Sequence, residues 1–360
     1  MPRFGNSRIR VGDLVEVRPI EEILATLDGK GCLGGMPFMP EMVRHCGKQY
    51  RVAMSAHKTC DTIRYTGNLH MPDMVHLEGL RCDGSAHGGC QAMCLFFWQK
   101  AWLKRVSPSQ SRLSKHPGPP MPTISLDDLN ARASSVTSSG ELKYFCQVTE
   151  SPRAGKLWPW WNPLQYLQDV VSGNWSVGHV TSVIFLALLR RTIKILPGYR
   201  IQMWLYNYIA RTTHRNTYAE IEGFRGQIPV RQQTPALENS FQPGDWVRIK
   251  PLSEISATLN VQGKNRGLFF DAEMVPYCGG RYRVNSLVHR LIEEGTGRMM
   301  EMKNPCVALD SVVCRSEYSV KRLMCPRSIV PVWRPIWLEK LDTEEPATVA
   351  APQATLTGKP

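Results

Sequence analysis

The stretch GDLVEVRPIEEILATLD (12–28) returns in altered form as GDWVRIKPLSEISATLN (244–260), and this pair decides how the chain is organised. The same shift of 232 positions places MPEMVRHCGKQYRVAMSAH (39–57) over DAEMVPYCGGRYRVNSLVH (271–289). Between Gly12 and His57 the two copies agree at 21 of 46 positions without a gap. Agreement at one fixed spacing indicates an internal duplication, which must be recognised before a fold is assigned.

The duplication continues to the end of each copy. At the same shift VHLEGLRC (75–82) lies over VALDSVVC (307–314). The register then slips by a few residues, and the copies close with FFWQKAWLKRV (96–106) and VPVWRPIWLEKL (330–341). We therefore predict a first copy over residues 10–106 and a second copy over residues 242–341.

The pattern inside each copy is mainly that of short β-strands. LVEV and WVRI alternate apolar and polar residues after Gly-Asp, and QYRVAM and RYRVNS do so after Cys-Gly. EEILATLD and SEISATLN have apolar residues three and four apart, which predicts one short helix in each copy. The glycine-rich stretch 29–35 predicts a turn.

The opening GDLVEV (12–17) or GDWVRI (244–249) resembles the start of SH3-like and KOW-type small barrels. The whole arrangement also resembles a bacterial family that carries this duplicated cysteine-containing module, and that resemblance implies no mechanism. The expected fold is α+β, with two homologous small β-rich modules of the SH3-like barrel type. A linker and a small helical insert are expected to join them.

Between the copies the composition changes twice. Residues 107–155 begin with a run rich in Ser and Pro and are predicted to be a linker. Residues 156–235 are predicted to be helical, with helices from Pro163 to Ser172, Val177 to Leu196 and Tyr199 to Thr212. Residues 342–360 have no apolar periodicity and are predicted to be a disordered tail.

The apolar run VTSVIFLALL (180–189) is ten residues long, well short of the ~20 that span a bilayer. We therefore expect no transmembrane segment. Basic and aromatic residues surround the run, so residues 177–200 can also be interpreted as an amphipathic helix on a membrane surface. Packing into the core is the favoured interpretation. The opening MPRFGNSRIR lacks the apolar core of a secretory signal, and we expect a cytoplasmic chain whose eleven cysteines are mostly reduced.

The net charge of +13 and the pI of about 9.3 raise the question of nucleic-acid binding. Lys and Arg exceed Asp and Glu by 4 over residues 1–106, by 6 over 107–241 and by 3 over 242–360. Phosphate binding requires clustered cations, whereas charge spread this evenly is typical of a soluble surface. Nucleic acid is therefore a possible partner that the sequence does not favour, and a protein partner is a further possibility.

Cysteine and histidine are concentrated at the end of the first copy. The run RCDGSAHGGCQAMC, with AHKTC upstream, predicts a tetrahedral metal site of four thiolates, or of three thiolates and one imidazole. The preferred ligands are four cysteines, with either of two histidines as a substitute: Cys60, Cys82, Cys90, Cys94, His57 and His87. Structural zinc is the expected ion, with iron as the alternative. The competing interpretation is that these are buried thiols.

The second copy keeps part of this set. Its weaker candidate ligands are Cys306, Cys314, Cys325 and His289. Cys314 stands at the place of Cys82, while Cys325 corresponds either to Cys90 or to Cys94, depending on where the gap is placed. The remaining cysteines, Cys32, Cys46, Cys146 and Cys278, are expected to be inert or buried thiols.

Other chemistry is sparse, since the sequence has no phosphate loop, GxSxG elbow or HExxH pair. The leading hypothesis is a non-catalytic, metal-stabilised binding or scaffold protein. One alternative is a nucleic-acid-binding protein with KOW-like modules, and another is a metal-dependent or thiol enzyme of bacterial biosynthesis. Two tryptophan pairs, Trp98 with Trp102 and Trp333 with Trp337, are expected either at the seam between the copies or in their cores.

Overall fold

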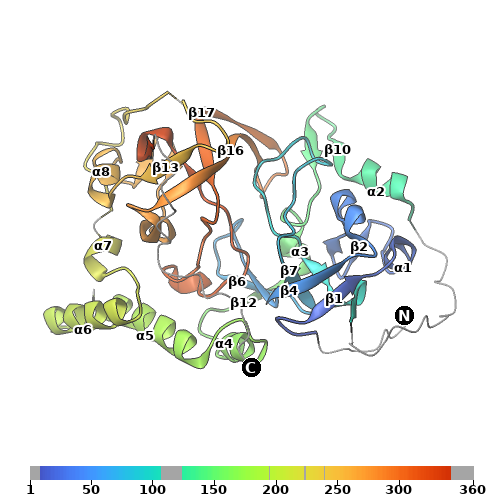
Figure 1. Cartoon of the computed structure of the whole chain (residues 1–360), viewed down its shortest axis with the longest axis horizontal. Coiled ribbons are helices and arrows are strands. Elements are labelled where there is room, and N and C mark those ends of the chain that lie inside the picture. Colours follow the sequence, from blue (N-terminus) through green and yellow to red (C-terminus); the bar gives the residue numbers. More distant parts are fainter. Residues whose placement is uncertain (1–8, 107–123, 194, 223, 239, 342–360) are drawn as a thin grey trace.

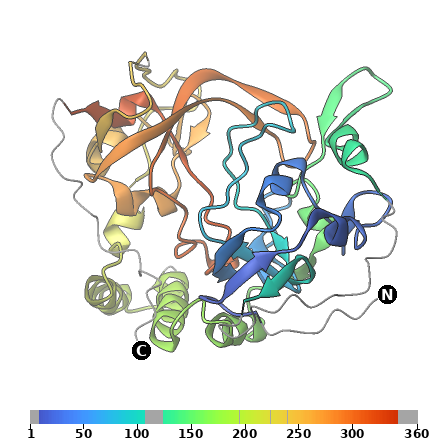
Figure 2. The same ribbon diagram turned by 45° about the vertical axis from the view of Figure 1, so that its right-hand side comes forward.

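The computed structural model describes residues 9–106, 124–193, 195–222, 224–238 and 240–341. It is a mixed α+β structure with several antiparallel sheets and a helical middle region. Figure 1 shows the first copy in blue and the second copy in orange as two β-rich lobes, with helices α4, α5 and α6 along one edge. In the turned view of Figure 2 these helices lie beneath both lobes.

The first copy is built on a five-stranded antiparallel sheet. The strand order is β8-β7-β4-β1-β9. The strands are β1 (Leu14–Val17), β4 (Gln49–Ser55), β7 (Met74–Leu77), β8 (Trp98–Gln99) and β9 (Leu103–Arg105). Val15 and Val17 in β1 are buried while Leu14 and Glu16 are partly exposed, as the alternation in the sequence predicts.

The second copy has a sheet with the corresponding strand order, β18-β17-β16-β13-β19. The strands are β13 (Trp246–Ile249), β16 (Arg281–Ile292), β17 (Met299–Leu309), β18 (Val332–Trp333) and β19 (Leu338–Lys340). The register also corresponds, because Val15 lies opposite Tyr50 and Val247 lies opposite Tyr282. The difference lies in β16 and β17, which form one long ribbon where the first copy has separate shorter strands.

Most of the smaller elements also occur at corresponding places. In the first copy they are α1 (Ile20–Leu24), β2 (Cys32–Leu33), β3 (Met36–Pro37), η1 (Pro40–His45) and η2 (Lys100–Trp102). In the second they are α8 (Leu252–Ala257), β14 (Lys264–Asn265), β15 (Leu268–Phe269), η3 (Ala272–Tyr277) and η5 (Pro335–Trp337). The first copy also has β5 (Lys58–Cys60) and β6 (Asn68–His70), whose counterparts are the ends of β16 and β17, and the second copy also has η4 (Val320–Arg322). The short helix predicted in each copy is thus α1 or α8.

The two tryptophan pairs are core anchors, because all four side chains are completely buried in the cores of their own copies. Trp102 meets the ring of Phe38 edge-on at 5.2 Å, and Trp337 meets Phe270 at 5.3 Å. The indole nitrogens of Trp102 and Trp337 also donate a hydrogen bond each to a threonine hydroxyl just beyond the short helix, at 3.0 Å in the first copy and 2.9 Å in the second. The position of these residues at the seam, the other expectation, was wrong.

The helical middle consists of α4 (Leu164–Val171), α5 (Val177–Ile193), α6 (Tyr199–Thr212) and α7 (Tyr218–Glu222). Pro163 precedes α4 and Ser172 follows it, as predicted, and α6 has the predicted bounds. The apolar stripe of α5 is buried at Val180, Val183 and Leu186, where it packs against α4, α6 and the second copy. No helix in the described part of the chain is long and apolar enough to cross a membrane.

Residues 124–155, assigned to the linker from the sequence, are structured. They form α2 (Leu126–Arg132), the hairpin β10 (Ser134–Val136) with β11 (Leu142–Tyr144), and α3 (Ser151–Ala154), and are followed by β12 (Lys156–Trp158). Ile124 and Leu129 are buried in the core of the first copy. The linker assignment was therefore wrong over this range, while its part over 107–123 and the tail predicted over 342–360 lie outside the described residues.

The two copies meet through a reciprocal contact. The backbone N–H of Cys60 in the first copy donates to Sγ of Cys325 in the second, at 3.0 Å. Conversely, the N–H of Ile292 in the second copy donates to Sγ of Cys90 in the first, at 3.4 Å. Ile292 stands at the position of Cys60 under the shift of 232, so each copy offers the same strand position to a cysteine of the other. Such a self-complementary contact is typical of twofold interfaces.

The contact is reinforced where corresponding positions of the two copies face each other. Thr62 and Glu294, also related by the shift of 232, are joined by a hydrogen bond from the threonine hydroxyl. The buried guanidinium of Arg327 donates to the Thr62 hydroxyl at 2.8 Å and pairs with Glu294. The two copies are thus joined by buried polar contacts as well as by apolar packing.

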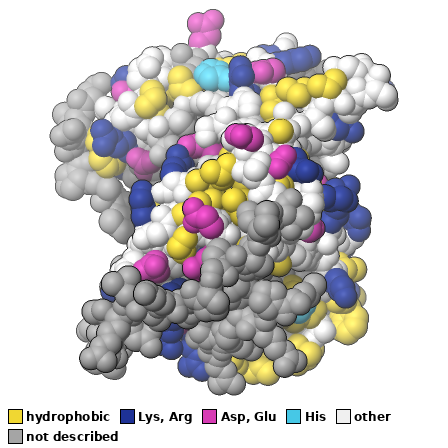
Figure 3. Space-filling model, turned by 90° about the vertical axis from the view of Figure 1, so that its right-hand side faces the viewer, with side chains coloured by type: hydrophobic (Ala, Val, Ile, Leu, Met, Phe, Trp, Pro, Cys, Tyr) yellow, Lys and Arg dark blue, Asp and Glu magenta, His cyan; other side chains and the backbone are white. Residues whose placement is uncertain are grey.

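Charge on the face seen in Figure 3 is mixed. Lys and Arg side chains are interspersed with Asp and Glu there, in keeping with the even charge distribution of the sequence.

Candidate metal centre

The loop that follows β7 in the first copy folds back on itself around Cys82. Gly84 has φ +74°, and a Cβ at this position would lie 2.2 Å from the backbone oxygen of Cys90, so no other residue fits. The amides of His87 and Gly89 both donate to the carbonyl of Gly84, at 3.0 and 2.9 Å. The loop therefore holds His87 beside Cys82 through backbone geometry.

Three buried side chains meet at this loop. Nε2 of His87 lies 3.2 Å from Sγ of Cys82, within hydrogen-bonding distance. Nδ1 of the same ring lies 3.0 Å from Oε1 of Glu41, which comes from η1 and also accepts a hydrogen bond from the Ala86 amide at 3.0 Å. Glu41 and His87 are buried and Cys82 is partly buried. The ligand atoms of the three residues lie within 4.8 Å of one another, so this group can hold a metal ion.

The electrostatics of the group favour an ionised carboxylate beside a neutral thiol. Burial by itself raises the pKa of Glu41, but the interactions with His87 and the backbone hydrogen bonds together outweigh it, and the pKa lies below its ordinary value. Burial, and then the charge of Glu41, raise the pKa of Cys82 well above its ordinary value. A bound metal ion reverses this preference, because a coordinating thiol is deprotonated.

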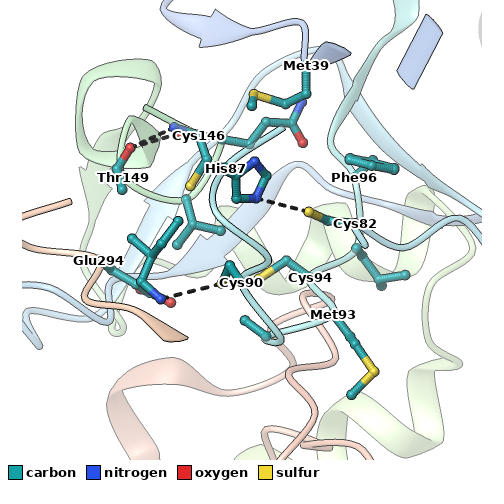
Figure 4. A pocket seen from close by; sticks show the side chains of 15 residues that line it. Met39, Cys82, His87, Cys90, Met93, Cys94, Phe96, Cys146, Thr149 and Glu294 are labelled. Atoms are coloured by element: carbon teal, nitrogen blue, oxygen red, sulfur yellow. Dashed lines mark hydrogen bonds between the residues drawn. The ribbon is translucent and has the colours of Figure 1, made fainter. Parts of the chain in front are cut away.

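A small cavity opens beside the group. Four cysteines line it, namely Cys82, Cys90, Cys94 and Cys146, and Figure 4 shows them around the same space. Most of the other lining side chains are apolar, among them Met39, Phe96 and Val148. The second copy contributes Ile292 and Glu294 to the wall, so the cavity belongs to both copies.

The predicted first-copy ligands are divided between two places. Cys82, His87, Cys90 and Cys94 all line the cavity. Cys60 lies instead at the contact between the copies, where its thiol hydrogen-bonds to Cys325. His57 is buried against Asp169 of α4, with 3.1 Å between Nε2 and Oδ1, and the buried amine of Lys58 pairs with the same carboxylate. The structure thus keeps Cys60 and His57 out of the site.

The predicted second-copy ligands do not come together either. Cys306 accepts a hydrogen bond from Arg334 at 3.2 Å, and His289 is exposed on β16. Cys314 contacts the hydroxyl of Ser316 at 3.4 Å, and Cys325 faces Cys60. Within the described residues, the group of Glu41, Cys82 and His87 is the one set of three or more ligand side chains that can share an ion.

The structure also shows which cysteine of the first copy corresponds to Cys325. The amide of Met324 donates to the carbonyl of Ser316 at 2.7 Å, as the amide of Gly89 does to that of Gly84. Cys325 therefore corresponds to Cys90, and the loop of the second copy is three residues longer.

The second copy lacks the histidine of this group but keeps the glutamate. Glu273 accepts from the Tyr318 amide at 2.7 Å, just as Glu41 accepts from the Ala86 amide. The next residue is Ser319, where the first copy has His87. The second copy thus keeps the carboxylate and the thiol of Cys314 without the imidazole between them.

Two site residues were missed from the sequence, Glu41 and Cys146. Glu41 recurs as Glu273 in the shared EMV motif, a signal that was visible but pointed equally to the core. Cys146 lies in the range assigned to the linker, and nothing in its local sequence separates it from an inert thiol. Comparisons of the chain with protein families and with curated proteins find no match.

Proposed function

We propose that the protein is a metal-stabilised scaffold in which the first copy binds a metal centre in the cysteine-lined cavity and the second copy closes it. In this proposal the chain consists of two homologous modules of the SH3-like barrel type. The zinc or iron expected from the sequence would be held at Cys82 and His87, and its role would be structural.

The observation that carries the proposal is the buried group of Glu41, His87 and Cys82 on the wall of the cavity. Burial of an ionised carboxylate is costly unless a cation compensates it. Metal-bound histidines commonly place their second ring nitrogen against a carboxylate, which fixes the ring and raises its basicity. The contacts of His87, with Glu41 on Nδ1 and Cys82 on Nε2, fit this arrangement.

The test is metal analysis of the full chain purified without added metal or chelator. Wild type is expected to contain a stoichiometric amount of zinc or iron, and Cys82→Ser is expected to lose it. Cys314→Ser is the matched control, because it removes the corresponding thiol from the copy that lacks the histidine. Wild-type protein that stays metal-free after incubation with zinc and with ferrous iron would contradict the proposal, as would equal loss in the two variants.

A second candidate is a thiol enzyme, favoured by the fact that the two nitrogens of His87 contact different partners. In such a relay the proton of Cys82 passes to His87 as Sγ attacks an acyl carbon, and Glu41 stabilises the imidazolium. His87 then protonates the leaving group, and water hydrolyses the thioester. The test is the rate at which iodoacetamide labels Cys82 in protein that contains no metal. Labelling that is much slower in His87→Ala than in the wild type would favour this candidate.

Binding of nucleic acid, of a protein partner or of a membrane surface through residues 177–200 remains a prediction from the sequence, as does the cytoplasmic location.

A further inference from the structure

We propose that the centre in this cavity is an iron–sulfur cluster held by Cys82, Cys90, Cys94 and Cys146. The inference rests on the proposed function, in that it assumes a metal-binding cavity, and it identifies the kind of centre that the cavity takes.

The first argument is the number of thiols and where they come from. Cys82, Cys90 and Cys94 lie on one folded loop, and Cys146 is brought in by the segment between β11 and α3. Four cysteine thiolates are the usual ligand set of [2Fe–2S] and [4Fe–4S] clusters. Cys146 is separated from the loop by more than fifty residues, so the fold, not the local sequence, completes the set.

The second argument is the spacing of the thiols. Two thiolates on one zinc ion lie at most about 4.6 Å apart, because each Zn–S bond is about 2.3 Å long. Among the described residues, no three of these four thiols lie within 4.8 Å of one another. The set is therefore too wide to share a single ion as it stands. In a cluster each thiolate binds a separate iron or one of two irons, and the thiols can stand farther apart.

The third argument is the hydrogen bonding of the sulfurs. The Gly84 amide donates to Sγ of Cys82 at 3.3 Å, and the Ile292 amide donates to Sγ of Cys90 at 3.4 Å. N–H groups directed at cysteine sulfurs are one of the means by which proteins stabilise such clusters and set their potentials. In this arrangement His87 contacts the sulfur of Cys82 from the protein side, and Glu41 orients its ring.

The experiment is anaerobic purification of the full chain, followed by measurement of iron, zinc, acid-labile sulfide and visible absorption. Wild type is expected to contain iron and sulfide in about equal amounts and to show the broad charge-transfer absorption of a cluster. Cys146→Ser is expected to lose most of the iron and sulfide, although Cys146 lies outside the group of Glu41, Cys82 and His87. Cys278→Ser, a partly buried thiol of the second copy, is the control and should keep both.

The outcomes separate the two proposals. Stoichiometric zinc without sulfide, unchanged by Cys146→Ser, overturns the cluster and upholds the metal-stabilised scaffold. Protein that takes up no metal even after anaerobic incubation with ferrous iron and sulfide overturns both. Circular dichroism and thermal unfolding of Cys146→Ser and of Cys94→Ala distinguish loss of the cluster from loss of the fold, because iron that is absent from a folded variant identifies a ligand.

Discussion

Replacement of Glu273 by glutamine is expected to remove a loss of stability that the second copy undergoes as the pH rises. This carboxyl is 6% exposed, and its Oε1 accepts a hydrogen bond from the Tyr318 amide at 2.7 Å. Its Oε2 is buried without a partner. Burial raises the pKa of Glu273 from 4.5 to about 7, since the backbone hydrogen bonds offset only part of the desolvation.

The raised pKa of Glu273 determines how the stability changes with pH. Because the pKa is higher in the folded chain, the folded state holds the proton more tightly than the unfolded state does. The resulting stability is fully present below pH 4.5 and is lost as the pH rises through about 7. The difference between the raised and the ordinary pKa of Glu273 corresponds to about 3 kcal/mol in the free energy of unfolding. About 2 to 3 kcal/mol of this is lost between about pH 5 and about pH 8.

The assay is urea unfolding of the wild type and of Glu273→Gln at these two pH values, with free energies obtained by linear extrapolation. Glutamine cannot ionise, so the variant should gain about 2 to 3 kcal/mol relative to the wild type as the pH is raised. Val312→Ala is the control, because it removes methyl groups from the same core and should lower stability equally at both values. If the difference between Glu273→Gln and wild type does not change with pH, the carboxyl does not titrate as its burial requires and the reasoning fails.

Two further predictions concern other buried polar groups. Asp169→Asn leaves the buried ammonium of Lys58 without its counter-ion and is expected to cost about 3 to 5 kcal/mol in urea unfolding, whereas Asp169→Leu combined with Lys58→Met should recover most of that loss. Thr26→Val and Thr258→Val each leave a buried indole N–H unpaired and should each cost about 1 to 3 kcal/mol, with nearly equal losses because the two hydrogen bonds correspond. Unequal losses would show that the two tryptophan anchors are not equivalent.

Local sequence signals were sufficient to predict those helices and strands whose conformation is determined by their own residues. Pro163 and Ser172 bound α4 as expected, and α6 runs from Tyr199 to Thr212 as the pattern indicated. The alternation after each Gly-Asp gave β1 and β13. Residues 124–155 were misassigned because their few apolar side chains, such as Leu129, are buried by the first copy and leave no periodic pattern of their own.

The candidate site was only partly predictable, for the opposite reason. Cys82 and His87 share one loop. Both belong to the predicted ligand set, and in the structure they are in contact. Cys60 was grouped with them because it is near in sequence, yet its strand carries it to Cys325 in the other copy. Glu41 and Cys146 reach the site through tertiary packing, which no local spacing encodes.

The reciprocal contact gives a physical reason for retaining two copies. Each copy presents one strand position to a cysteine of the other, so neither cysteine loop is complete in a separated copy. The surroundings of the two cysteines nevertheless differ. Cys90 receives the amide of Ile292 at the wall of an open cavity, whereas Cys325 receives that of Cys60 and its loop is covered by α5 through Leu323 and Met324.

Helix α5 packs against the second loop, and Ser319 stands there at the position of His87. The second copy then acts on the site through its backbone and through Ile292 and Glu294, which close the cavity that the first copy lines with thiols. Isolated residues 10–106 would therefore lack both this wall and the N–H donor to Cys90, and Cys146 as well. The metal centre proposed for the first copy thus requires the second copy and the segment between them.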